Sequence, residues 1–131
     1  MRTAIVVSIL GCVLLCVCGC KRAESPTKPA SSSALAGRLK AAQAITDFSE
    51  RNNSLSQLAK DAADAGDPAL VNESLQGIND FSLRNDTTAS AALKLGKAGK
   101  GDDAVTVAQT IGDLSVRDRV LIKLSKGDYS E

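Results

Sequence analysis

The strongest constraint on the fold is an eight-residue phrase that recurs with a 33-residue period. Its three copies are Ile45-Thr-Asp-Phe-Ser-Glu-Arg-Asn52, Ile78-Asn-Asp-Phe-Ser-Leu-Arg-Asn85 and Ile111-Gly-Asp-Leu-Ser-Val-Arg-Asp118. Five of the eight positions keep their chemical character in all three copies. A fixed period of this length is typical of stacked structural units, which bury their apolar faces mainly against their neighbours.

The segments around the phrase have the spacing of amphipathic helices. Leu35, Leu39, Ala42 and Ile45 fall on one helical face, which predicts a first helix over about residues 34–46. The phrase should start the next helix, because its Asp and its Ser both offer an oxygen to free amide groups of a first turn. The residue type leaves open which of the two is the cap.

Glycine turns should separate the remaining helices. Gly66-Asp67-Pro68 predicts the end of the second helix and the start of a third over about residues 69–79, since glycine favours a left-handed cap and proline favours a first turn. In the next copy, the position of the turn Gly99–Asp102 predicts that the first helix is longer, and the second helix shorter, by about two residues than in the copy before. The 33-residue period is kept because the two changes compensate. The sequence therefore predicts an all-α array of helical hairpins over residues 34–131, with about six helices and a 33-residue period.

Composition excludes several classes of protein. The 16 basic and 15 acidic side chains give a net charge of +1, so there is no charge excess to attract nucleic acid. The chain has no histidine, and its four cysteines all lie in the first twenty residues, which argues against a zinc site or a disulfide framework in the predicted domain. We expect no metal and no cofactor.

Residues 1–19 have the pattern of a signal peptide. An apolar run over residues 4–19 follows Arg2 and precedes Lys21 and Arg22. The run is shorter than the roughly 20 residues that a membrane-spanning helix needs. Length alone does not separate cleavage from retention as an anchor.

The end of this run, Val17-Cys18-Gly19-Cys20, resembles the lipobox of bacterial lipoproteins. The resemblance implies cleavage before Cys20, attachment of a diacylglycerol to its thiol and further acylation of its amino group with a chain such as palmitate. Cys18 differs from the family's usual residues at the tolerant position. Two or more acyl chains anchor a protein stably, because each buried methylene contributes about 0.8 kcal/mol.

Residues 20–33 should form the lipidated cysteine and a disordered tether, since they are rich in Ser and Pro and lack large apolar side chains. In lipoproteins of Gram-negative bacteria, the residue after the lipidated cysteine influences sorting, and an aspartate there resembles a signal for retention in the inner membrane. This sequence has Lys21 at that position. We therefore expect a lipid-anchored protein of the bacterial cell envelope, in the outer membrane if the cell is Gram-negative.

A helical pair with this 33-residue period is similar to the tetratricopeptide class of α-solenoids. The phrase resembles degenerate bacterial units that carry an Ile-x-Asp pair followed by Arg. The Trp, the Gly-Tyr pair and the closing Pro of the strict tetratricopeptide pattern are not at their places. The similarity implies a hairpin stack that binds protein partners.

Two sets of side chains are candidates for such contacts. Arg51, Arg84 and Arg117 each follow an Asp by four residues, so the Asp/Arg pairs can form a charged row that grips an acidic ligand, or serve only to cap and brace the fold. The second set is an apolar edge in the last helix, made of Val120, Leu121 and Leu124 with Ile122 beside them. A partner or a second copy would cover that edge, unless the last helix folds inward.

Phe48, Phe81 and Leu114 recur in the phrase and are predicted to wedge between successive hairpins, with an exposed aromatic groove as the alternative. Catalysis would have to use paired carboxylates, and Asp61, Asp64, Asp67, Asp102 and Asp103 are the available acids. The main expectation is a non-enzymatic binding or assembly module. The alternatives are a carboxylate-dependent glycan hydrolase of the envelope and a purely structural surface lipoprotein.

Overall fold

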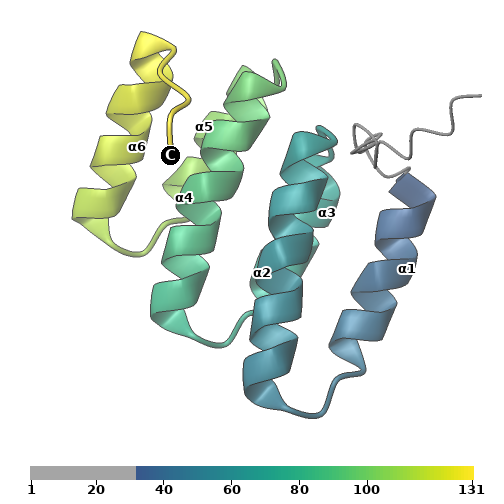
Figure 1. Ribbon diagram of the computed structural model, residues 1–131. Coiled ribbons are helices and arrows are strands. Elements are labelled where there is room, and N and C mark those ends of the chain that lie inside the picture. Colours follow the sequence, from purple (N-terminus) through teal and green to yellow (C-terminus); the bar gives the residue numbers. More distant parts are fainter. Residues whose placement is uncertain (1–31) are drawn as a thin grey trace, which may run out of the picture.

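Residues 32–131 of the chain are described by a computed structural model, and within them six α-helices and no strands occur (Figure 1). The helices are α1 Ser32–Gln43, α2 Phe48–Asp64, α3 Pro68–Gln76, α4 Phe81–Lys97, α5 Gly101–Gln109 and α6 Leu114–Lys126. The predicted all-α class is confirmed for this part of the chain. The predicted signal peptide, Cys20 and most of the predicted tether lie outside the described residues.

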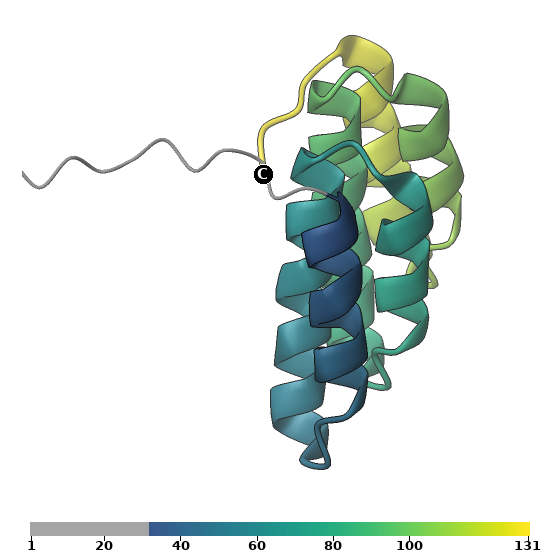
Figure 2. The same cartoon turned by 90° about the vertical axis from the view of Figure 1, so that its right-hand side faces the viewer.

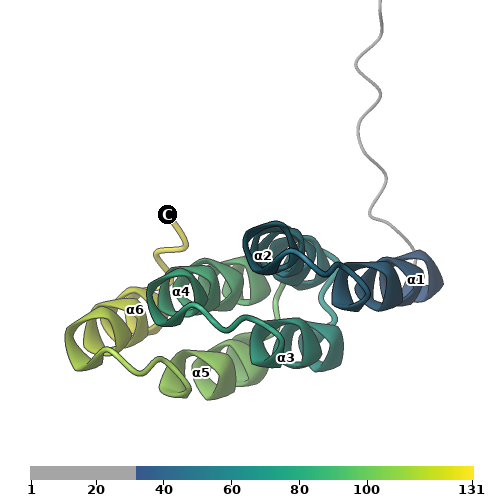
Figure 3. The ribbon, with the colours of Figure 1, turned by 90° about the horizontal axis from the view of Figure 1, so that it is seen from below.

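The helices stand side by side in a row that runs from α1 at one end to α6 at the other (Figure 1). The long helices α2 and α4 pack against each other, and α6 packs against α4. The short helices α3 and α5 lie on one side of this layer, and α1 packs against α2 and α3 (Figure 3). Figure 2, seen from the α1 end, shows that the axes run roughly along one direction.

Helix lengths correct one detail of the sequence analysis. Helices α2 and α4 both contain 17 residues, and α3 and α5 both contain 9. The predicted lengthening of one helix and shortening of the other is therefore wrong. The glycines around residue 100 obscured the boundary, because Gly101 is already the first residue of α5.

Aspartates cap the three helices that begin in the phrase. Asp47, Asp80 and Asp113 have extended backbones, and their side chains accept hydrogen bonds from the amide three residues later, at 2.9, 2.7 and 3.1 Å. Of the two caps that the sequence left open, Asp is the one used. Helix α1 ends at Gln43 and α3 at Gln76, three residues before their predicted ends. The ends come earlier because the chain must leave each helix before it reaches the extended Asp cap of the next one.

The turns follow the predicted chemistry of Gly and Pro. Gly66, Gly99 and Gly127 have φ of 70°, 79° and 67°, a left-handed conformation that side chains with a Cβ adopt only at a cost. Pro68 lies in the first turn of α3, where its missing N–H removes no helical hydrogen bond.

Small and aliphatic side chains form the core. Its largest fully buried members include Leu35, Leu55, Leu58, Ile78 and Leu95, and alanines on α2 and α4 allow these two helices to approach closely. One polar contact lies between them: the hydroxyl oxygens of Ser56 and Thr87 are 2.7 Å apart and buried. Within residues 32–131, every buried side-chain nitrogen or oxygen has a hydrogen-bond partner.

Candidate functional site

The three arginines of the phrase do not form a row of ion pairs with their aspartates. Among the salt bridges of residues 32–131, none joins an Asp of the phrase to the Arg four residues later, because the Asp carboxylates cap helices instead. The Arg51 guanidinium lies 4.5 Å from the centroid of the Phe48 ring. Arg117 Nε lies 3.6 Å from a carboxylate oxygen of Asp118, and Arg84 lines a hollow of about 210 Å³ between α3 and α4.

The last residue of the phrase has a role that the sequence analysis missed. The side-chain oxygen of Asn52 accepts a hydrogen bond from the Asn79 amide at 3.1 Å, and that of Asn85 accepts one from the Gly112 amide at 3.0 Å. Each bond joins the start of one long helix to the loop before the next long helix. The third copy has Asp118 at this position, and no described residue follows at the corresponding distance along the chain.

The repeated Phe and Leu side chains are not wedges. Phe48, Phe81 and Leu114 are all more than half exposed, with Phe48 at 67%. Each is the first residue after an Asp cap, at the start of its helix. The Phe81 ring instead covers the backbone of Gly112, where an added Cβ would come within 2.8 Å of the ring.

The predicted apolar edge of α6 divides into buried and exposed members. Val120 is only 4% exposed and belongs to the core, so it is not available for contacts. Leu121 and Leu124 are half-buried against the core, and Ile122 is 54% exposed. Leu114 and Ile122 are thus the most exposed apolar side chains of the final helix, and we call the surface of Leu114, Asp118, Leu121 and Ile122 the α6 end.

At the other end of the row lies a hollow of about 440 Å³, which we call the α1-end hollow. It is lined by side chains of α1, α2 and the loop between them: Arg38, Ala41, Ala42, Ile45, Ser54, Gln57 and Leu58. Ile45 is half-buried here, whereas its counterparts Ile78 and Ile111 are buried. The difference arises because no described helix precedes α1 to cover Ile45.

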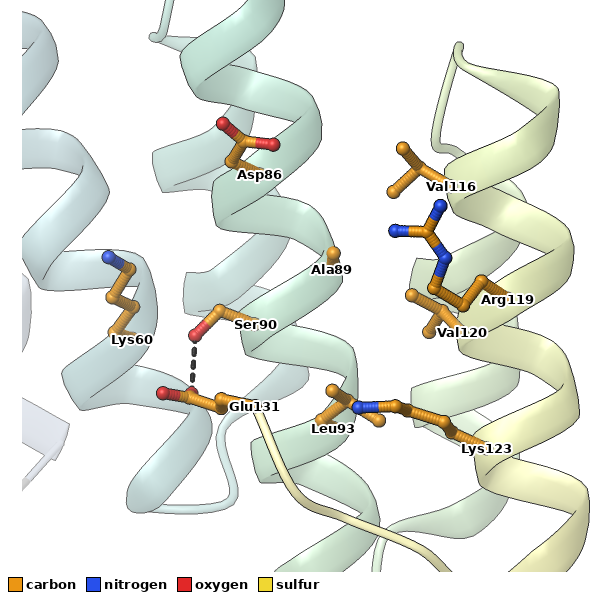
Figure 4. A pocket seen from close by; sticks show the side chains of 10 residues that line it. All are labelled: Lys60, Asp86, Ala89, Ser90, Leu93, Val116, Arg119, Val120, Lys123 and Glu131. Atoms are coloured by element: carbon orange, nitrogen blue, oxygen red, sulfur yellow. Dashed lines mark hydrogen bonds between the residues drawn. The ribbon is translucent and has the colours of Figure 1, made fainter.

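A third depression, of about 340 Å³, lies between α4 and α6 and is bordered by the C-terminal segment (Figure 4). Ser90 Oγ donates a hydrogen bond to Glu131 Oε1 at 2.6 Å, and Lys123 Nζ donates one to the Ser130 carbonyl at 2.7 Å. Further up the segment, the Tyr129 ring packs on Gly96 of α4. The lining combines cations and anions, so it favours no ligand of a single charge.

Three of the five acids that were candidates for catalysis have structural roles, and the other two, Asp102 and Asp103, lie in the first turn of α5. Asp61 lies 2.7 Å from Arg38, Asp64 lies 2.9 Å from Lys94, and Asp67 caps α3. The hydrogen bond from Lys94 to Asp64 raises the pKa of Lys94 above its ordinary value of 10.5. No group of three or more His, Cys, Asp or Glu side chains suited to a metal ion occurs among the described residues.

Comparisons with known proteins add no identification. No protein-family profile matches the chain, and no curated protein or solved structure is significantly similar to it. None of the helices in residues 32–131 has the length and apolar character needed to cross a bilayer.

Proposed function

We propose that this chain is a lipid-anchored α-solenoid of the bacterial cell envelope that acts as a protein-binding or assembly module. The solenoid has a 33-residue unit made of a short and a long helix. Its lipid is attached at Cys20, and its binding surface lies at the α6 end. The observation that carries the binding role is the pair of uncovered apolar surfaces at the two ends of the helix row.

Helix boundaries support the solenoid. Helices α2 and α4 start at Phe48 and Phe81, and α3 and α5 start at Pro68 and Gly101, so both pairs are offset by the same 33-residue period as the phrase. The asparagine hydrogen bonds have the same offset, from Asn52 to Asn85. Equal offsets in helices and in contacts are expected when one unit is copied and stacked.

Exposed apolar side chains support a binding role. A terminal unit of a solenoid normally presents a polar outer face, because nothing else in the chain covers it. Here the α6 end presents Ile122 and Leu114, and the opposite end presents Ile45 and Ala41. Apolar surface of this kind is typical of sites that another protein covers.

The anchor is tested by changing Cys20 to serine. The Cys20→Ser protein should not incorporate labelled fatty acid and should move from the membrane to the soluble fraction, because it has lost the thiol that carries the lipid. The matched control is Cys18→Ser, which should still be labelled. Labelling and sedimentation of Cys20→Ser with membranes would show that the anchor is misassigned.

The binding surface is tested with a photo-crosslinking amino acid at position 122 of the full chain in intact envelopes. Irradiation should link this position to a protein, and a crosslinker at Glu73, exposed on the outer side of α3, should give much less product. If position 122 gives no protein adduct above the Glu73 background, the proposed binding role is wrong.

A further inference from the structure

We propose that the partner of the α6 end is the α1 end of a second copy of this chain, so that copies join head to tail. This inference rests on the proposed function and names its partner. The two ends are counterparts of surfaces that already pack against each other inside the chain. The internal contact between α2 and α4 therefore serves as the template for the contact between copies.

Three contacts define the template. The Ser56 and Thr87 hydroxyls lie 2.7 Å apart, and Leu55 covers Gly77, where an added Cβ would come within 2.7 Å of a Leu55 methyl carbon. The third is the hydrogen bond from the Asn79 amide to Asn52. Each contact joins a long helix to the next long helix or to the loop before it.

When the register of α2 against α4 is applied between α6 of one copy and α2 of the next, specific residues of the two copies form pairs. Ile122 occupies the position of Ser56 in the last 33-residue repeat, and Ser54 occupies the position of Thr87 in the first. By the same offset, Leu121 falls against Ala44 of the next copy, which is exposed. Ile122 then enters the α1-end hollow, which Ser54 and Ile45 line.

The polar groups at the two ends also match. Asp118 stands where Asn52 and Asn85 accept their backbone hydrogen bonds, and its carboxylate oxygens are acceptors. Thr46 stands where Asn79 and Gly112 donate theirs, and within residues 32–131 its amide donates to nothing. In the joined copies the Thr46 amide donates to Asp118, which extends the asparagine series by one member.

This contact is heterologous, because it joins different surfaces of the two copies. The joined dimer keeps one free α1 end and one free α6 end, so it can add further copies in a row. A two-fold dimer that joins two α6 ends would leave the α1-end hollow of both copies uncovered.

The first test pairs cysteines across the proposed junction in the full-length, membrane-anchored protein. Cells produce two differently tagged chains, Ile122→Cys and Ser54→Cys, and envelopes are oxidised. A disulfide-linked dimer of the two tags should form at least about fivefold more than with either variant alone, since the template hydroxyls are close enough for a disulfide. The control replaces Ser54→Cys by Glu73→Cys, which should give only the background.

The second test measures association of the purified full chain in detergent by sedimentation. Ile122→Asp should weaken self-association at least about tenfold, and Asp118→Ala should weaken it about fivefold, in keeping with the loss of one hydrogen bond. Asp118→Asn should bind within about threefold of the natural chain, because Asn is the acceptor in the first two copies. Helical circular dichroism should be the same in all variants, since Ile122 and Asp118 are exposed.

The outcomes separate this inference from the proposed function. If Ile122→Cys links to itself and not to Ser54→Cys, the head-to-tail arrangement is wrong. If the chain remains a monomer while a crosslinker at position 122 captures a different envelope protein, the second copy is the wrong partner and the binding role stands. If position 122 captures nothing above background, both proposals fail.

Discussion

Asn85 shows how one side chain can hold two helices in register. It is nearly buried, and its amide oxygen accepts the Gly112 amide at 3.0 Å, so the start of α4 is tied to the loop before α6. The bond is part-buried, because Asn85 is buried whereas Gly112 is exposed. Water can therefore replace the lost acceptor only in part.

We predict that Asn85→Ala lowers the free energy of unfolding by about 1–3 kcal/mol. Asn52→Ala should cost less, because Asn52 is half-buried and its donor, the Asn79 amide, is in an exposed position where water can replace the acceptor. Urea unfolding followed by circular dichroism measures both values. Equal losses in the two variants would contradict the importance of burial at this contact.

Asp113 links the stability of α6 to pH. The Ser115 hydroxyl and the amides of Val116 and Ser115 donate hydrogen bonds that hold the pKa of this exposed carboxyl below its ordinary value of 3.8. Because the folded pKa is the lower one, the cap stabilises α6 above about pH 4. That stabilisation is lost as the pH falls through the folded pKa.

Asp113→Asn keeps an acceptor oxygen at the cap and removes the titration. We predict that the variant is folded like the natural chain at neutral pH and loses less stability between about pH 5 and pH 2. Thermal melting across this range is the measurement. If the acid-induced loss is the same in both proteins, Asp113 does not contribute to it.

Single residues also show where prediction from sequence stops. The Asp cap and the Gly66 turn follow from local chemistry. The sequence therefore limited the cap to Asp or Ser and predicted the position of the turn. The bond between Asn85 and Gly112 joins residues 27 positions apart, and only the packing of α4 against the next unit brings them together. Likewise, the three consecutive apolar residues 120–122 did not reveal that Val120 is buried and that Ile122 is exposed.

Between elements, the contact of α2 with α4 combines alanines with one buried pair of hydroxyls. Ser56 and Thr87 satisfy each other, so removing one leaves the other without a partner in the core. Removing both leaves no unpaired group. The pair should therefore contribute more to the alignment of the two helices than to net stability.

We predict that Ser56→Ala and Thr87→Val each lower the free energy of unfolding by about 1–3 kcal/mol. The double variant should lose clearly less than the sum, with a coupling of about 1 kcal/mol. A double-mutant cycle by urea unfolding measures this. Additive losses would mean that the two hydroxyls are satisfied independently; Thr106→Val, on the exposed side of α5, is the neutral control.

Helix starts were more predictable than helix ends. The starts of α2, α3, α4 and α6 coincide with Asp caps or Pro68, which have a direct chemical reason to be there, whereas α5 starts at Gly101 without a side-chain cap. The ends of α1 and α3 come earlier than their apolar pattern suggests, because the half-buried Ile45 and the core residue Ile78 lie in loops and not in helices. An apolar period extends across a turn whenever the turn itself packs on the core.

At the scale of the whole fold, the described residues form a continuous core. Twenty-one buried apolar side chains, from Leu35 to Val120, form one cluster that touches all six helices. We predict that a fragment of residues 32–131 folds without the preceding segment and gives a circular dichroism spectrum dominated by helix. The helices are short, and α1, α3 and α5 would be marginal in isolation, so packing must hold them.

This fragment should melt in one transition, with modest stability, because alanine faces bury little area. Leu55→Ala, which opens the core between α2 and the loop after α3, should lower the free energy of unfolding by about 2–5 kcal/mol. Ile122→Ala is the matched exposed control. A fragment spectrum typical of coil would show that residues before 32 are needed for folding.

Tyr129 gives the protein an internal optical probe. The chain has one tyrosine and no tryptophan, so fluorescence excited at wavelengths that phenylalanine does not absorb comes from this ring alone. The ring packs on Gly96, where an added Cβ would lie within 2.5 Å of it, and it is partly open to solvent. Quenching by iodide will therefore follow release of the segment 127–131 from α4, while far-ultraviolet dichroism follows melting of the helices, and one sample can separate the two events without a label.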